Sequence, residues 1–194
     1  MALGGRIRGK KTSLRLPEEA DLARYNDWMA DTRVRRLHWV WHEPAMPATW
    51  KERLKEIAKD RQEILWSIEA DGALVGLAMG SVHHLGAGFS LHHLLIDPDR
   101  WRQGYGSDAA LALHRYLFDY LDLRRTDIEV QADNLAALRI AERLGYVEYA
   151  RSHQVFYRDG QYIGQVSLMM DKEIWHQRWS SEREYPPLPA DATR

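Results

Sequence analysis

The chain of 194 residues contains no cysteine. This absence excludes disulfide bonds, metal sites with thiolate ligands and a cysteine nucleophile. Neither sign of charge is in excess, because 27 lysines and arginines oppose 28 aspartates and glutamates, for a formal net charge of -1. A partner such as nucleic acid or a membrane surface would select for a broad basic field, and we therefore expect neither.

Long apolar runs are also missing. No stretch approaches the roughly 20 residues that a membrane-spanning helix needs, and no signal-peptide pattern opens the sequence. Hydrophobic residues make up 45% of the chain and charged residues 28%, which is the balance of a globular protein with a full core. We therefore expect one cytoplasmic protein with a single folded domain.

The most informative stretch runs from Ile96 to Asp108. It follows an apolar run and precedes a long amphipathic run, so we expect a strand, a glycine-bearing turn and the start of a helix. The unpaired N–H groups and the positive dipole end of such a helix suit a phosphate. Gly104 and Gly106 would let a ligand lie against the backbone, and Arg102 adds a cation. The alternative reading is a helix start that needs glycine only for tight packing.

Three segments occur in the order found in the GNAT N-acetyltransferases and resemble that family's signatures. They are residues 14–21 (LRLPEEAD), 96–109 (IDPDRWRQGYGSDA) and 129–146 (EVQADNLAALRIAERLGY). The middle segment resembles the acyl-CoA pyrophosphate loop, usually Gln/Arg-x-x-Gly-x-Gly/Ala, with Trp101 in the first position. A tryptophan there is similar to the branch of ribosomal-protein N-terminal acetyltransferases and diamine acetyltransferases. The resemblance spans roughly residues 13–173.

The resemblance implies an α/β (α+β) fold: a single mixed central sheet of about seven strands with helices on both faces. Its two parallel central strands would splay apart and admit the pantetheine arm of acetyl-CoA, the expected co-substrate, with no metal. The implied cofactor-binding groups are the backbone of Leu94, Leu95 and Ile96, the loop residues Arg102, Gln103, Gly104, Tyr105, Gly106 and Ser107, and the side chain of Asn134. A gap between strands agrees with this, because its unpaired backbone groups need hydrogen-bond partners.

The implied reaction is direct attack of an amine on the acetyl thioester, which needs a base for the ammonium and an acid for the leaving thiolate. Many family members use a tyrosine seven residues after the signature asparagine, where this chain has Ala141. Tyr157, Ser107 or solvent would have to replace it as the acid.

Glu129, five residues before Asn134, is the predicted general base, acting through a water. The alternative is that Glu129 pairs with an arginine or points away from the cleft, which would move attention to His92, His93 and ordered water. As neighbours on a strand, these histidines should point to opposite faces, so a shared metal is not expected.

Residues 33–48 combine many aromatic side chains with no clear helical or strand period. We predict that Trp39 and Trp41 form one wall of the acceptor site, since binding sites on loops mix aromatic and polar groups. Packing of these residues on the core is the alternative. The arginines of this region could attract an acidic acceptor or form a solvated face.

The expected domain boundaries are a flexible basic arm at 1–11, a GNAT-like domain at 12–173, and a short helix with a disordered tail at 174–194. We expect an acetyl-CoA-dependent N-acetyltransferase that acts on a primary amine of a small molecule or a protein N-terminus. The alternatives are a non-catalytic module that binds acyl-CoA and an interaction scaffold. The acceptor and a homodimeric state are left open at this stage.

Overall fold

One mixed sheet forms the centre of the fold. The structure, a computed structural model, describes residues 5–37, 47–59, 62–83 and 88–180, and the structural statements below concern those residues. The sheet has eight strands in the order β1-β2-β3-β4-β5-β6-β8-β7. All neighbouring strands are antiparallel except β5 and β6, which are parallel.

The strands are β1 (Arg6–Arg8), β2 (Ser13–Arg15), β3 (Glu63–Ala70), β4 (Ala73–His83), β5 (Gly88–Ile96), β6 (Arg125–Gln131), β7 (Val147–Arg158) and β8 (Gln161–Asp171). The helices are α1 (Leu22–Ala30), α2 (Thr32–Arg35), α3 (Pro47–Lys59), α4 (Tyr105–Arg115), α5 (Leu135–Leu144) and α6 (Lys172–Trp179). Short 3-10 turns lie at Glu19–Asp21 and Pro98–Arg100, and a π-helical turn at Tyr116–Tyr120 continues α4.

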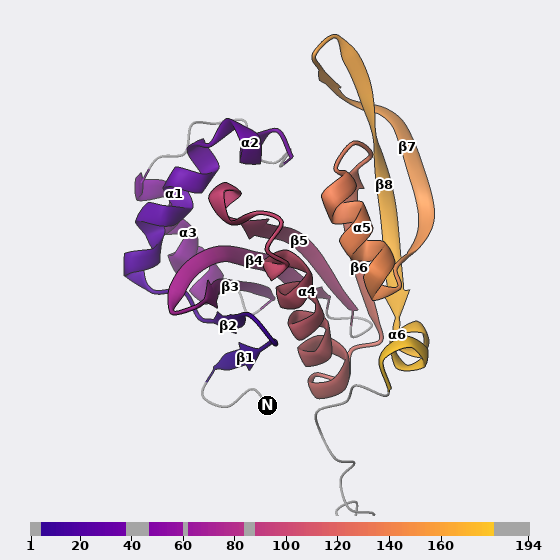
Figure 1. Cartoon of the computed structure of the whole chain (residues 1–194), viewed down its shortest axis with the longest axis horizontal. Coiled ribbons are helices and arrows are strands. Elements are labelled where there is room, and N and C mark those ends of the chain that lie inside the picture. The colour runs from indigo at the N-terminus through magenta and orange to yellow at the C-terminus, as the bar shows by residue number, and fades with distance from the viewer. Residues whose placement is uncertain (1–4, 38–46, 60–61, 84–87, 181–194) are drawn as a thin grey trace, which may run out of the picture.

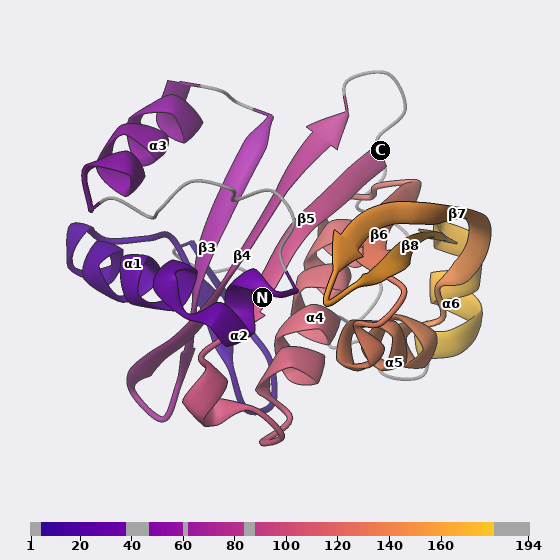
Figure 2. The ribbon, with the colours of Figure 1, turned by 90° about the horizontal axis from the view of Figure 1, so that it is seen from above.

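Helices cover both faces of the sheet (Figures 1 and 2). On one face, Trp28 of α1 and Trp50 of α3 belong to a buried cluster with Leu77 of β4. On the other face, Leu113 of α4 packs in a cluster with Phe89 of β5. A third cluster joins α5 and α6 to β6 and β8. The expected fold is confirmed, and the sheet has one strand more than the expected number of about seven.

The additional strand is β1, which corrects the expectation of a flexible arm over residues 5–11. Arg6–Arg8 pairs with β2, and Ile7 is buried in the cluster beneath α4. Arg6 also forms an ion pair with Glu69 of β3. The charged residues of this segment suggested solvation, but the single apolar side chain and the ladder hydrogen bonds fix it at the edge of the sheet.

At the other end of the described chain, α6 forms where a short helix was expected. The disordered tail was expected to complete residues 174–194, and its residues 181–194 lie outside the described part of the chain. None of the described helices has the length and apolar character needed to cross a membrane.

The two parallel strands pair over only part of their length. Their register runs from Gly88 opposite Arg125 to Leu91 opposite Ile128. Beyond Leu91, β5 pairs only with β4, and beyond Ile128, β6 pairs only with β8. The two strands diverge from that point (Figure 1), as the sequence resemblance implied.

A β-bulge lies where the divergence begins. Met79 is opposite His93 and Gly80 is opposite Leu91, so His92 is an extra residue in β5. A Cβ on Gly80 would lie 2.2 Å from Cζ of Phe89, which explains why β4 has glycine there.

A buried polar pair joins α4 to the start of β7. The imidazole of His114 donates from Nδ1 to the carbonyl oxygen of Ala110 at 2.7 Å, because a carbonyl can only accept. Its Nε2 then accepts a hydrogen bond of 2.6 Å from the hydroxyl of Tyr146. Burial lowers the pKa of His114 from 6.5 to about 4, so the ring is neutral at neutral pH.

This pair predicts a specific loss of stability in acid. Between the folded and unfolded pKa values of His114, only the unfolded chain binds the proton, so stability falls as the pH falls through this window. We expect its contribution to drop by about 2 kcal/mol from about pH 7 to about pH 5. Urea denaturation should show that loss in the parent and not in the double variant His114→Phe/Tyr146→Phe, which removes both polar partners. Equal pH slopes in the two proteins would show that His114 is not the titrating group.

Candidate active site

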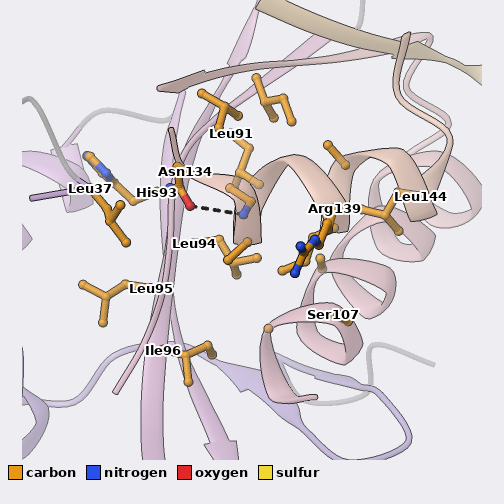
Figure 3. A pocket seen from close by; sticks show the side chains of 18 of the residues that line it. Leu37, Leu91, His93, Leu94, Leu95, Ile96, Ser107, Asn134, Arg139 and Leu144 are labelled. Atoms are coloured by element: carbon orange, nitrogen blue, oxygen red, sulfur yellow. Dashed lines mark hydrogen bonds between the residues drawn. The ribbon is translucent and has the colours of Figure 1, made fainter. Parts of the chain in front are cut away.

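A cleft of about 930 Å³ opens between β5 and β6 beyond their last paired residues. Its walls come from β5 and β6, the turn before α4, and the facing surfaces of α4 and α5. Figure 3 shows Leu94 and Ile96, which belong to β5, and Arg139, which belongs to α5, around this space. We call this the β5–β6 cleft.

The backbone of β5 presents alternate residues to the cleft. The N–H of Asp97 donates to the carbonyl of Val75, which sets the alternation of the β4–β5 ladder. By this alternation the backbone of Leu95 pairs with β4, whereas the backbone groups of Leu94 and Ile96 point toward the cleft. The carbonyl of Ile96 accepts a hydrogen bond from the indole of Trp101 at 2.7 Å.

The three β5 residues that the resemblance implied as backbone partners of the cofactor therefore differ in what they offer. Leu94 offers both an N–H and a carbonyl to a ligand, and Ile96 offers its N–H. Leu95 does not, and its buried side chain packs in the cluster beneath α1 and α3. The difference follows from the two-residue period of a strand, which the sequence could not resolve without the register.

The turn before α4 has the conformation of an anion-binding site. Arg102 has a φ of 65° and Gly104 a φ of 85°, and α4 begins at Tyr105. The N–H groups of Tyr105, Gly106 and Ser107 lie in the first helical turn, where no carbonyl within the helix can accept from them. These groups and the helix dipole favour a bound anion at this end of the cleft.

The structure calls for glycine at residue 104 but not at residue 106. Gly104 is required by its left-handed backbone conformation, which other residues rarely adopt. Gly106 has no such requirement, because an added Cβ would lie 3.4 Å from Cδ1 of Ile140 and 3.5 Å from Cγ1 of Ile96. Protein packing therefore leaves room for a methyl group at residue 106.

Four arginines line the β5–β6 cleft and have no carboxylate partner among the described residues: Arg100, Arg102, Arg139 and Arg143. Arg102 was expected here from the sequence. Arg100 and Arg139 were missed, because an isolated arginine on a turn or helix reads as a solvated side chain. Figure 3 shows the Arg139 side chain extending from α5 into the space between α5 and α4. Together they give the cleft a positive lining.

Asn134 is held at the start of α5. Its Oδ1 accepts a hydrogen bond of 3.2 Å from the N–H of Ala137, which makes it the N-cap residue of the helix. The cap fixes which side-chain atom is the oxygen, so Nδ2 is the donor that the residue presents to the cleft that it lines. Gln103, by contrast, is exposed and is not among the residues lining the cleft.

Glu129 and His92 lie where the two strands diverge. Ile128 and Val130 pack in the cluster with α5, so the alternation of β6 turns Glu129 to the face on which α1 and α3 lie. Its side chain is exposed and lines the cleft. The Nε2 atom of His92 is 2.8 Å from Oγ of Ser81, on the same face.

The two histidines do not point to opposite faces as expected. The bulge at His92 brings its ring to Ser81, and Figure 3 shows His93 on the side of Leu37 and Leu95. Protein atoms around the ring of His92 replace water that would solvate its charged form, and this desolvation lowers the pKa of His92 below its usual value. His92 is therefore a neutral imidazole at neutral pH, beside Glu129.

The structure does not place all of the candidate proton donors for the thiolate at the cleft. Tyr157 is 68% exposed on β7, forms an edge-to-face contact with Tyr162 at 5.0 Å, and is not among the residues lining the cleft. Ser107 and Ala141 line the cleft, but Ala141 carries no proton donor. The structure thus gives the thiolate no nearby tyrosine from either position considered in the sequence.

The acceptor side is described only in part. Val34 and Leu37 line the cleft, whereas Trp39 and Trp41 lie outside the described residues. Arg33 pairs with Asp31 at 2.7 Å, and Arg36 with Asp159 at 2.6 Å. These carboxylates offset the positive charge that suggested an acidic acceptor.

Comparison with known proteins identifies the family. Residues 11–147 match the model of the acetyltransferase (GNAT) domain, which is well over half of the chain. The chain belongs to the GNAT acetyltransferase family. It is thus an N-acetyltransferase, and the family uses acetyl-CoA.

Solved GNAT structures share the fold at low sequence identity. Spermidine N-acetyltransferase from Vibrio cholerae, in complex with CoA and spermine, is 18% identical, with a TM-score of 0.77 over 85% of this chain and 98% of that chain. A GNAT-family acetyltransferase from Bacillus anthracis is 16% identical, with a TM-score of 0.74 over 87% and 99%. A dodecameric form of the Vibrio cholerae enzyme is 19% identical, with a TM-score of 0.73 over 87% and 98%.

The glycine geometry predicts a selective effect of Gly106→Ala. The methyl group fits among the protein atoms but occupies the space that we assign to the cofactor. We expect the folded variant to bind acetyl-CoA at least about tenfold more weakly, by calorimetry, because the diphosphate loses its close approach to the N–H groups of the turn.

Gly88→Ala is the matched control. A Cβ at residue 88 would lie 3.6 Å from Cδ2 of His83 and 3.7 Å from the carbonyl oxygen of Arg125, at the end of β5 away from the turn. Its affinity for acetyl-CoA should stay at the parent level. Unchanged affinity in a folded Gly106→Ala protein would contradict the placement of the cofactor.

Proposed function

We propose that this chain transfers the acetyl group of acetyl-CoA to a primary amine by direct attack of the nitrogen on the thioester carbon. The observation that carries the proposal is the β5–β6 cleft, which opens where strand pairing ends and leads to the turn before α4. Acetyl-CoA has an extended arm with two amides and a diphosphate at its far end. The cleft offers unpaired strand backbone along its length and cations at its mouth.

The residues present fit acetyl-CoA. The N–H groups of Tyr105, Gly106 and Ser107 would hold the diphosphate, assisted by Arg102. The backbone of Leu94 and the Nδ2 group of Asn134 would pair with the amides of the pantetheine arm. The acetyl thioester is the electrophile that the cofactor supplies when bound.

Glu129 is the general base of the proposal and acts through a water. Most primary amines are protonated at neutral pH, so the nitrogen must lose a proton before it attacks. Glu129 accepts that proton, the N–C bond forms and the C–S bond breaks. Solvent protonates the leaving thiolate, since Ala141 carries no donor and Tyr157 lies away from the cleft.

The acceptor is an amine of a small molecule or a protein N-terminus. The spermidine N-acetyltransferase structure with CoA and spermine supports testing polyamines among the small molecules. Trp39 and Trp41 stay predicted components of the acceptor wall. Self-association also stays a prediction for this chain, supported by the dodecameric relative.

An acceptor screen tests the proposed function. Release of CoA from acetyl-CoA is followed with polyamines, simple primary amines, amino acids and peptides with unblocked N-termini. Turnover with an amine supports the proposal, and the product should carry one added acetyl group by mass. Binding of acetyl-CoA without turnover on any amine would favour the non-catalytic alternative.

The role of Glu129 predicts a change in the pH–rate profile. A base must be ionised to work, so the parent should lose activity toward acid as Glu129 becomes protonated. Glu129→Gln should lower kcat by about 100-fold and abolish that acidic limb, while acetyl-CoA affinity is kept.

Glu173→Gln is the control, because Glu173 is an exposed carboxylate on α6. It should leave both kcat and the profile unchanged. A Glu129→Gln protein that keeps the parent's turnover and pH dependence would exclude Glu129, and the neutral imidazole of His92 would then be the next base to test.

A further inference from the structure

The turn between β1 and β2 is fastened to the first turn of α4 by one carboxylate. Asp108 accepts hydrogen bonds from the N–H groups of Lys10 at 3.0 Å, Lys11 at 2.9 Å and Thr12 at 2.8 Å. The hydroxyl of Thr12 donates a fourth bond of 2.8 Å. These bonds join segments that are 96 to 98 residues apart in the sequence.

Gly9 shows how closely the turn approaches this carboxylate. A Cβ on Gly9 would lie 2.2 Å from Oδ2 of Asp108, which is too close for any side chain without a shift. The turn of residues 9–12 therefore follows the Asp108 side chain, and its position relative to α4 is defined.

This turn places the ammonium group of Lys11 at the cofactor loop. Nζ of Lys11 donates a hydrogen bond of 3.0 Å to the carbonyl oxygen of Gln103. A Cβ on Gly104 would lie 3.3 Å from the same Nζ atom, so the ammonium lies against the residue that precedes α4. Lys11 is exposed and is not itself among the residues lining the β5–β6 cleft, whereas Gly104, which its ammonium group contacts, is one of them.

A cation in this position is unfavourable in the absence of an anion. The positive end of a helix dipole repels cations, and Arg102 already lies in the same turn. Asp108 offsets part of this charge, and its oxygens accept the hydrogen bonds from residues 10–12. A bound phosphate would reverse the balance, because an ammonium has three donors and the Gln103 carbonyl uses one.

We propose that Lys11 binds the diphosphate of acetyl-CoA and that Asp108 is the positioning residue that holds it there. The proposal rests on the proposed function, which places the diphosphate on the N–H groups of residues 105–107. We assign Lys11 to the diphosphate and not to the 3′-phosphate, because its ammonium is bonded to the turn that carries those groups. The basic N-terminal segment thus completes the cofactor site from the far side of α4.

Lys11→Met tests the contact without an acceptor or turnover. We expect calorimetry to show about tenfold weaker binding of both CoA and dephospho-CoA, which lacks the 3′-phosphate. The control is Lys55→Met, which removes the same charge from the exposed ion pair with Glu52 on α3. Both affinities should stay within about twofold of the parent in that control.

The results of these binding measurements distinguish a failure of this inference from a failure of the proposed function. A loss confined to CoA would move Lys11 to the 3′-phosphate and overturn the assignment, as would unchanged binding of both ligands. If the parent itself bound neither ligand, the proposed function would fail together with this inference. Parent binding with an unaffected Lys11→Met variant would overturn this inference alone.

Asp108→Asn tests the positioning role. The amide keeps the size of the side chain but loses the charge and one acceptor, so residues 10–12 should be held less firmly. We expect affinity for dephospho-CoA to fall about threefold to tenfold in the parent background and by less than about twofold in Lys11→Met. Equal losses in both backgrounds would show that Asp108 stabilises α4 without acting through Lys11. Lys11→Arg should recover most of the affinity if a cation is what the site requires.

Discussion

The structure depends on the point at which β5 and β6 stop pairing. Backbone N–H and carbonyl groups that leave a ladder inside a protein must find other partners. Past Leu91 and Ile128 the two strands keep their outer neighbours but lose each other. One freed carbonyl, that of Ile96, is taken by the indole of Trp101. The others line the β5–β6 cleft, where our proposal pairs them with the amides of the pantetheine arm.

The bulge at His92 connects this site to the acceptor side. An extra residue in β5 increases the local twist and bends the strand away from β6 at the level where pairing ends. It also brings the His92 ring to Ser81 on the face toward which Glu129 points. The same irregularity thus lies where the β5–β6 cleft opens and brings His92 to the face that carries Glu129. Next to the bulge, Phe89 approaches Gly80 so closely that a side chain on residue 80 would collide with its ring.

The parts of the site that the sequence predicted are those encoded within a few residues. The turn before α4 and the strand leading to Ile96 follow from glycine and apolar patterns, and the structure has both. The bulge depends on the register between two strands, and the Asp108 contacts join distant segments. Neither leaves a local pattern, which is why the N-terminal segment was read as a free arm. The positive φ of Arg102 also had no sequence signal, since glycine was absent there.

The missing tyrosine at residue 141 raises the question of whether Tyr146, which also lines the cleft, could act as the acid. Its hydroxyl already donates to His114, whose other nitrogen is committed to the Ala110 carbonyl. Burial raises the pKa of the Tyr146 hydroxyl above its usual range, and the neutral His114 beside it would not stabilise a phenolate. A donor of this kind gives up a proton less readily than water-exposed tyrosine does. The His114–Tyr146 pair therefore forms part of the wall of the cleft, which agrees with our proposal that solvent protonates the thiolate.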